Sequence, residues 1–207
     1  MLDKSVPYVD VMMRRDAGVP LPEFPLPEGY RVVRYQPGDE KAWARIEASV
    51  LEFPDALDAL LYYQKNFMPF AQAGELARRC LFIEDAQGEK VATTTAWWSH
   101  VGERRVPWLH WVAVMPSHQG RGLGKAIVAA ALHRMAEIEG DCVCYLHTQT
   151  WSHKAIKIYG KAGFVITDEP NLGNCANTEY ARALQVLADI DAGRIGDGVV
   201  QRGGLSQ

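Results

Sequence analysis

Hydrophobic and polar residues alternate along the chain at two characteristic spacings, and these predict its strands and helices. Short apolar runs bounded by turn residues predict strands at Tyr30–Tyr35, Arg79–Glu84, Lys90–Ser99, Cys142–His147 and Val165–Ile166. The second and third of these flank a turn at 86–88, which is typical of a hairpin. The run Val106–Val114 is apolar at odd and even positions alike, which indicates a central strand covered on both faces.

Apolar residues spaced three and four apart predict the helices. Helices are expected from Asp39 to about Val50, from Asp55 to Phe67, from Leu123 through Ile138, from Ser152 to Gly160 and from Thr178 to Ile190. Asp39 follows a Pro-Gly turn and is placed to cap the first helix. The order strand–helix–helix–three strands–helix–strand–helix–strand predicts an α/β protein with an α+β mixed sheet.

The composition divides the chain into three parts. Residues 1–29 contain prolines at 7, 20, 22, 25 and 27 and are expected to form an extended N-terminal arm. Residues 30–168 are expected to form one folded domain, and residues 169–207 a C-terminal helix followed by a glycine-rich flexible tail. A length of 207 residues with 48% hydrophobic residues is ordinary for a single domain with a full core.

Charge and cysteine content exclude several classes of function. The net charge is −3 and no basic stripe occurs, so we expect no nucleic-acid partner. The N-terminus has no cationic segment followed by an apolar run, and the longest apolar stretch, Ala126–Leu132, is too short to span a membrane. The 4 cysteines and 6 histidines have no metal-ligand spacing. We therefore expect a cytoplasmic protein with reduced thiols, no membrane partner and no metal.

The chemistry is concentrated in a glycine-rich turn, Gly120–Lys125, between the strand Val106–Val114 and the following helix. Backbone N–H groups at a helix N-terminus point outward and favour an anion, so this turn predicts a phosphate-binding site. A P-loop would need Ser or Thr after Lys125 and a glycine in place of Gln119. A dinucleotide fingerprint would need a glycine at Lys125. Both patterns are therefore excluded.

The remaining pattern, Q-x-x-G-x-G at Gln119, Gly122 and Gly124, follows a Val-Ala-Val strand end and resembles the acyl-CoA motif of the GCN5-related N-acetyltransferase (GNAT) superfamily. The later residues Ala155, Tyr159, Gly163 and Phe164 fall in the register of the superfamily's second half. Ser152 departs from the pattern because it occupies a position that is usually Asn. The resemblance covers roughly residues 30–168.

The resemblance implies a GNAT acyl-CoA N-acyltransferase fold with a V-shaped opening between its fourth and fifth strands, where acetyl-CoA would bind as cosubstrate. The N–H groups of Gly120–Lys125 would hold the pyrophosphate, with Arg121 or Lys125 adding charge. Backbone at Val112–Val114 would pair with the pantetheine arm, and the Val114 N–H would polarise the thioester. The residues expected to contact the cosubstrate are Val112, Ala113, Val114, Gln119, Gly120, Arg121, Gly122, Leu123, Gly124, Lys125 and Ser152.

Two residues are the expected catalytic groups. Tyr159 matches the family's acid and would protonate the leaving thiolate. Many relatives carry a base Glu on the fourth strand, but Val106–Val114 contains none. His110, expected on the same strand face as Val114, resembles the basic histidines of arylalkylamine N-acetyltransferases. His147 is the alternative base, and Glu47, Glu52 and His100 are more distant candidates.

The acceptor site is expected near the first two helices, where many aromatic residues occur. They are Phe53, Tyr62, Tyr63, Phe67, Phe70, Trp97, Trp98, Trp108 and Trp151, and they could form either the core or a pocket for an aromatic or cationic amine. The preferred function is direct transfer of acetyl from acetyl-CoA to a primary amine of a small molecule. The alternatives are a peptide or protein amine as acceptor, and a non-catalytic acyl-CoA-binding module. Dimers are common in the superfamily, so a homodimer is also an open expectation.

Overall fold

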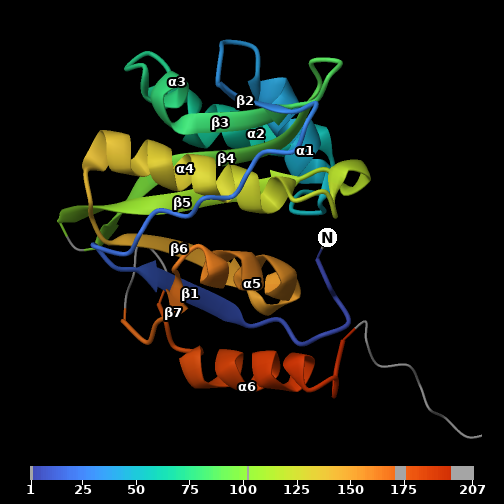
Figure 1. Ribbon diagram of the computed structural model, residues 1–207, viewed down its shortest axis with the longest axis vertical. Coiled ribbons are helices and arrows are strands. Elements are labelled where there is room, and N and C mark those ends of the chain that lie inside the picture. Colours follow the sequence, from blue (N-terminus) through green and yellow to red (C-terminus); the bar gives the residue numbers. More distant parts are fainter. Residues whose placement is uncertain (1, 102, 171–175, 197–207) are drawn as a thin grey trace, which may run out of the picture.

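One mixed sheet runs through the molecule. The computed structural model describes residues 2–101, 103–170 and 176–196. The strands are β1 (Asp10–Arg15), β2 (Arg31–Arg34), β3 (Cys80–Glu84), β4 (Lys90–Val101), β5 (Arg104–Val114), β6 (Cys144–Gln149) and β7 (Val165–Ile166). They form a 7-stranded sheet in the order β2-β3-β4-β5-β6-β1-β7 (Figure 1). Neighbours are antiparallel except β5 and β6, which are parallel, so the predicted mixed sheet is confirmed.

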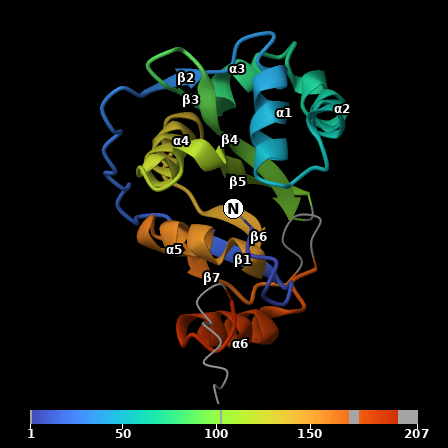
Figure 2. The same ribbon diagram turned by 90° about the vertical axis from the view of Figure 1, so that its right-hand side faces the viewer.

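Helices cover both faces of this sheet. They are α1 (Glu40–Ser49), α2 (Ala56–Asn66), α3 (Glu75–Arg79), α4 (Leu123–Glu139), α5 (His153–Lys161) and α6 (Tyr180–Asp191), with 3-10 turns η1 (Met68–Phe70), η2 (Pro116–His118) and η3 (Thr150–Ser152). Figure 2 shows α1 and α2 on one side of the sheet and α4 and α5 on the other. Residues of β5 therefore pack into hydrophobic clusters on both sides of the sheet, as its continuous apolar pattern predicted.

Most elements begin and end within a few residues of the predicted positions. The helix α3 was not predicted, because it has only 5 residues and shows too little periodicity. Asp55 caps α2, accepting hydrogen bonds from the N–H groups of Leu57 at 2.8 Å and Asp58 at 2.9 Å. Asp39 precedes α1, but its predicted capping role is wrong. Its carboxylate accepts from the N–H of Gln36 at 2.8 Å and so closes the preceding turn instead of the helix.

The N-terminal segment differs from the predicted arm. Asp10–Arg15 forms β1, which lies inside the sheet between β6 and β7. Val11, Met12 and Met13 are consecutive and all buried. The segment therefore lacks the alternation of polar and apolar residues by which a half-exposed strand is recognised in a sequence. Residues 16–29 contain no helix or strand, and they pack along α4 through Leu21 and Leu26.

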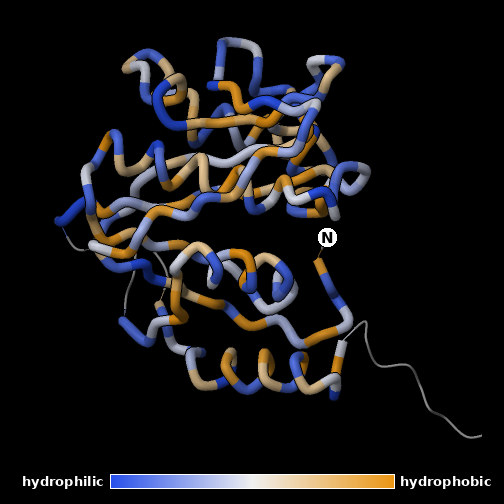
Figure 3. The backbone as a smooth tube through the Cα atoms, in the orientation of Figure 1, coloured by the Kyte–Doolittle hydropathy of each residue, from blue (hydrophilic) through white to orange (hydrophobic). Residues whose placement is uncertain are grey.

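The C-terminal helix is α6, somewhat later than predicted. Hydrophobic and hydrophilic residues alternate along it (Figure 3), and the buried Ala183 and Val186 turn toward the core next to β1. Residues 197–207 of the predicted flexible tail lie outside the described residues, as does Cys175. The other three cysteines are free thiols. Among the described residues, no helix has the length and hydrophobicity needed to cross a membrane.

Candidate active site

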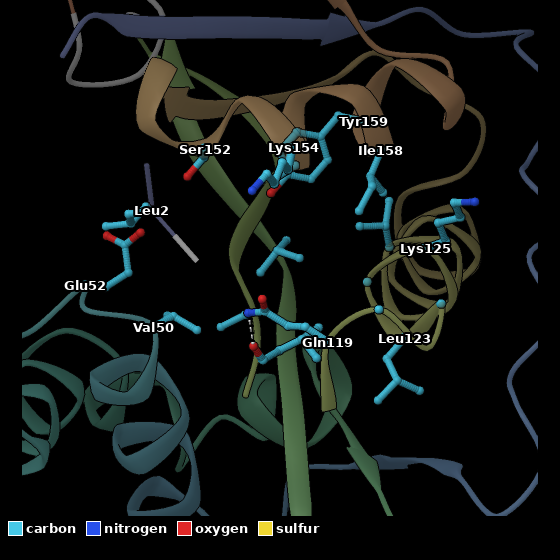
Figure 4. A pocket seen from close by; sticks show the side chains of 18 residues that line it. Leu2, Val50, Glu52, Gln119, Leu123, Lys125, Ser152, Lys154, Ile158 and Tyr159 are labelled. Carbon is cyan, nitrogen blue, oxygen red and sulfur yellow. Dashed lines mark hydrogen bonds between the residues drawn. The ribbon is translucent and has the colours of Figure 1, made fainter. Parts of the chain in front are cut away.

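A cavity of about 420 Å³ opens where β5 and β6 separate. The two parallel strands are paired at Trp108 and Tyr145, and they diverge toward the carboxyl end of β5. The cavity is lined by Leu2, Val50, Glu52, Val112, Ala113, Val114, Gln119, Gly120, Gly122, Leu123, Gly124, Lys125, Val128, Ser152, Lys154, Ala155, Ile158 and Tyr159 (Figure 4). Its volume is in the range of small-molecule sites. All the residues expected to contact the cosubstrate line it except Arg121.

The backbone of Val114 faces this opening. Met115 donates its N–H to the Val91 carbonyl at 2.8 Å, which makes these two a hydrogen-bonded pair of the β4–β5 ladder. In an antiparallel ladder such pairs alternate with pairs whose polar groups point outward. The N–H and C=O of Val114 therefore point away from β4, into the gap left by β6. The Gln119 amide donates to the Val114 oxygen at 2.8 Å, which couples the turn to the strand end (Figure 4).

The glycine turn presents the N-terminus of α4 to the same cavity. Gly122 has φ +90°, a left-handed conformation that glycine adopts without a steric cost. The N–H groups of Lys125 and Ala126 both donate to the Gly122 oxygen, at 3.1 and 3.2 Å. The N–H groups that precede them at the start of the helix therefore have no intrahelical acceptor and point outward. Because the dipole of the 17-residue helix α4 places partial positive charge at this end, these N–H groups form a favourable site for an anionic group.

Gly124 allows α4 to approach α5 closely. A Cβ atom built on this glycine would lie 3.2 Å from Ile158 Cδ1 and 3.9 Å from Val114 Cγ2. The absence of a side chain therefore leaves room on the cavity wall between the two helices. This close approach gives a physical reason for the second glycine of the Q-x-x-G-x-G pattern.

The two basic residues of the turn have different surroundings. Lys125 lines the cavity, and Figure 4 shows its ammonium directed away from the other lining side chains. Arg121 instead donates to the Tyr30 hydroxyl at 2.8 Å and to the Ser117 carbonyl at 3.1 Å. These bonds direct its guanidinium toward the segment before β2. Of the two, Lys125 is the better placed for a ligand in this cavity.

Tyr159 and Ser152 reach the cavity from α5 and the turn before it. Ser152 lies at the start of α5, and its side chain lines the cavity. Tyr159 is buried on the inner face of α5. Burial raises the pKa of the Tyr159 phenol, and the charges of Glu47 and Glu52 raise it further. The hydroxyl therefore stays protonated at neutral pH, as a proton donor must.

A β-bulge in β5 determines where His110 lies. Thr95 pairs with His110 and Thr93 with Ala113, so two residues of β5 stand opposite one residue of β4. Trp111, within the bulge, has φ +52°, which is unusual for a bulky side chain. The extra residue shifts the alternation of side chains along the rest of the strand.

The predicted position of His110 relative to Val114 is therefore wrong. Paired residues share a face. Pairing thus places His110 on the face of Ala113, whereas Val114 pairs with Ala92 on the opposite face. His110 also lies outside the residues that line the cavity. Desolvation lowers its pKa to about 4, with a further contribution from His147, so His110 does not titrate near neutral pH.

His147 lies on β6 and is exposed. Its Nε2 is 3.0 Å from Asp10 Oδ1 on β1, and it is not among the residues lining the cavity. His147 interacts electrostatically with His110 and with Glu52, and Glu52 lines the cavity.

The predicted aromatic residues mostly pack against one another. Tyr63, Phe67 and Trp97 are buried in a core cluster between α1, α2 and the sheet, and Trp43 stands at its centre. Trp108 belongs to a separate buried cluster. None of the nine lines the cavity. Most of these nine aromatic residues therefore belong to the packed interior of the protein and do not form a pocket for the acceptor.

Of three charged residues near the cavity, Glu47 and Glu52 were named from the sequence only as more distant candidates for the base, and Lys154 was not predicted. Glu52 and Lys154 line its wall. Glu47 is fully buried on α1, and its charge acts on Tyr159. The sequence signal for Lys154 was its place in the first turn of the predicted helix that carries Tyr159. Within the described residues, no group of three or more His, Cys, Asp or Glu side chains could hold a metal ion.

Comparison with solved structures supports the fold. A GCN5-related N-acetyltransferase from Sphaerobacter thermophilus aligns with a TM-score of 0.61 and 20% identity, over 80% of this chain and 50% of that one. A tandem GNAT protein from the clavulanic acid biosynthesis pathway aligns with a TM-score of 0.54 and 18% identity, over 80% of this chain and 52% of that one.

Sequence comparison identifies the family. Mycothiol acetyltransferase from Salinispora tropica is 29% identical over 161 residues, covering 73% of this chain and 50% of that protein. The mycothiol acetyltransferase of Streptomyces coelicolor is 30% identical over 161 residues, covering 75% and 48%. The chain thus spans about half the length of the curated relatives it matches. The model of the acetyltransferase (GNAT) family matches residues 42–164, more than half of the sequence, and the chain belongs to this family.

Proposed function

We propose that this chain transfers the acetyl group of acetyl-CoA directly to a primary amine of a small molecule. One observation carries the proposal. The outward-facing Val114 backbone, the N-terminus of α4 and the Tyr159 side chain all meet in a single cavity of about 420 Å³. Family membership makes acetyl-CoA the expected cosubstrate, and the relatives named as mycothiol acetyltransferases favour a small-molecule acceptor.

Each part of the cavity has a chemical role in this proposal. The N–H groups at the start of α4, with Lys125, would hold the pyrophosphate of acetyl-CoA. The open edge of β5 at Val112–Val114 would pair with the amide groups of the pantetheine arm. The Val114 N–H would then polarise the thioester carbonyl. Tyr159 would give a proton to the departing sulfur, and Ser152 would contribute one hydrogen bond.

Turnover tests the proposal. The purified chain is incubated with acetyl-CoA and a panel of arylalkylamines, polyamines, amino acids, aminoglycosides and short peptides, and thiol release is measured. We expect release with one class of small amine. Release with peptides alone would make the acceptor a peptide or protein. Acetyl-CoA binding without release from any amine would indicate a binding module, and absence of binding would refute the assignment of the cavity.

A further inference from the structure

The segment before β1, residues 2–9, lies against η3 and the start of α5. Near one end of the segment, the N–H of Asp3 donates to the Trp151 carbonyl at 2.8 Å. Near the other end, Val9 donates its N–H to the hydroxyl of the fully buried Thr150 at 3.0 Å and accepts from the Thr150 N–H at 2.9 Å. The segment is therefore fixed to η3 at both ends.

A buried contact between two side chains reinforces these bonds. His153 Nε2 lies 3.2 Å from Asp3 Oδ2, and the two residues are only 8% and 4% exposed. A carboxylate can only accept, so Nε2 carries the hydrogen and donates it. The other carboxylate oxygen, Oδ1, accepts from the N–H of Ser5 at 3.1 Å and from its hydroxyl. His153 is the first residue of α5, so the contact ties the segment to the helix that carries Tyr159.

The turn after α6 covers another side of the same segment. Val6 is buried. A Cβ atom built on Gly196 would lie 3.2 Å from Val6 Cγ1 and 3.3 Å from Asp3 Oδ2. Ile195, the residue before it, packs on the core cluster that contains Val9. The segment before β1 is therefore held from two sides, by η3 with α5 and by this turn.

This packing places the side chain of Leu2 in the cavity wall. Leu2 immediately precedes Asp3, is partly buried and lines the cavity. Figure 4 shows Leu2 beside Glu52 and close to Val50, across the cavity from the side chains of α4. The wall on this side therefore combines residues that follow α1 with a residue from the other end of the domain, which no local pattern in the sequence brings together.

The two sides of the cavity offer different chemistry. The N–H groups at the start of α4 favour an anion, so the pyrophosphate of acetyl-CoA is expected there. The side formed by Leu2, Val50 and Glu52 presents two apolar side chains and, among the described residues that line the cavity, the only carboxylate. A carboxylate repels phosphate and attracts an ammonium ion. An amine carried on an apolar group fits this side, because its carbon atoms can contact Leu2 and Val50.

We infer that this side of the cavity receives the acceptor, and that Leu2 determines how large a group the amine can carry. The inference rests on the proposed function and gives it an acceptor class, a primary amine on a small apolar group. Asp3 and His153 are positioning residues, because they fix the backbone from which Leu2 extends and neither of them lines the cavity. Without their contact, Leu2 is held by fewer bonds and the wall can widen.

The test compares two amines that differ by one phenyl group, ethylamine and 2-phenylethylamine, in the thiol-release assay. Leu2→Ala enlarges the acceptor side, so kcat/KM for 2-phenylethylamine relative to ethylamine should rise about tenfold. Leu2→Trp fills it, and the same ratio should fall about tenfold. The Kd of acetyl-CoA should change less than about twofold in both variants. Leu57→Ala is the matched control, since Leu57 is exposed on α2 and does not line the cavity, and it should change neither quantity.

Two variants of Asp3 test the positioning role. Asp3→Ala removes the acceptor of the His153 bond, so it should change the selectivity ratio in the same direction as Leu2→Ala. Asp3→Asn keeps an oxygen that can accept from His153 Nε2, and it should retain most of the wild-type ratio. Asp3→Ala should also lower the unfolding temperature, because it leaves a buried donor unpaired. A lower unfolding temperature with an unchanged ratio would show a purely structural role and overturn the positioning.

The outcomes separate the inference from the proposed function. If the wild type turns over, ratios within about twofold of its own in both Leu2 variants would overturn the inference alone. A weaker Kd of acetyl-CoA with an unchanged ratio would overturn it too, since Leu2 would then contact the cosubstrate. If the wild type acetylates neither amine, binding of 2-phenylethylamine to the CoA-saturated protein is measured by calorimetry. Tighter binding by Leu2→Ala and weaker binding by Leu2→Trp would support the inference without turnover, and equal binding or none would refute it.

Discussion

Replacing Gly124 by alanine adds one methyl group to the cavity wall, and it should separate folding from cosubstrate binding. Alanine favours a helix over glycine by up to about 1 kcal/mol. The new methyl would lie 3.2 Å from Ile158 Cδ1, the mobile end of a side chain that can rotate away. Folding should therefore gain up to about 1 kcal/mol, which raises the unfolding temperature by roughly 2–4 °C for a chain of this size.

Cosubstrate binding should respond in the opposite direction. If Ile158 moves, it moves into the space between α4 and α5 where the cavity lies. Overpacking of this kind costs about 1–3 kcal/mol. At 1.4 kcal/mol for each tenfold change, the affinity for acetyl-CoA should fall by about fivefold to a hundredfold. The measurements are thermal unfolding without ligand and the Kd of acetyl-CoA by calorimetry.

Gly160→Ala is a matched control. Gly160 is helical in α5, and a Cβ atom there would meet no other atom within 4 Å. This variant should show a similar gain in stability with an unchanged Kd. An unchanged Kd in Gly124→Ala would refute the assignment of the gap between α4 and α5 to the cosubstrate. A lower unfolding temperature in Gly124→Ala would instead show that Ile158 cannot yield.

Three further predictions follow from the site and its supports. Tyr159→Phe should lower kcat about 100-fold and leave the Kd of acetyl-CoA nearly unchanged in binding and thiol-release assays; full activity would exclude it as the acid. Arg79 is buried and bonded to Glu75, so Arg79→Met should cost about 3 kcal/mol in urea unfolding, whereas the exposed Arg78→Met should cost little. Burial raises the pKa of the Glu75 carboxyl, but the hydrogen bond and charge of Arg79 oppose this, and the pKa is lowered. The free energy of unfolding should therefore decrease as the pH falls below about 4.5. Glu75→Gln should weaken this pH dependence in urea unfolding measured at several pH values.

Contiguous features of the site could be predicted from the sequence. The turn Gly120–Lys125, the strand end Val112–Val114 and the register of Ser152 and Tyr159 on α5 are local patterns, because strand and helix periodicity place neighbouring residues relative to one another. The structure brings these segments together around one cavity. Their predicted roles in binding and catalysis stay predictions until turnover and binding are measured.

Features that depend on partners distant in the chain could not be predicted. The strand β1 is recognised only through its pairing with β6, far away in sequence. The position of His110 depended on a bulge, and one extra residue in a strand turns every later side chain to the other face. Sequence spacing assumes regular strands, so it placed His110 on the same face as Val114, and the structure places it on the opposite face.

The sequence by itself determined the family, the mixed sheet and the turn that begins α4, because these depend on local motifs and on the order of elements. Only the tertiary structure decided which charged groups meet. Glu47, on α1, acquires its burial and its proximity to Tyr159 from the packing of α1 and α5 around the same opening. Desolvation and distance between charges are properties of the folded chain, and no local pattern encodes them.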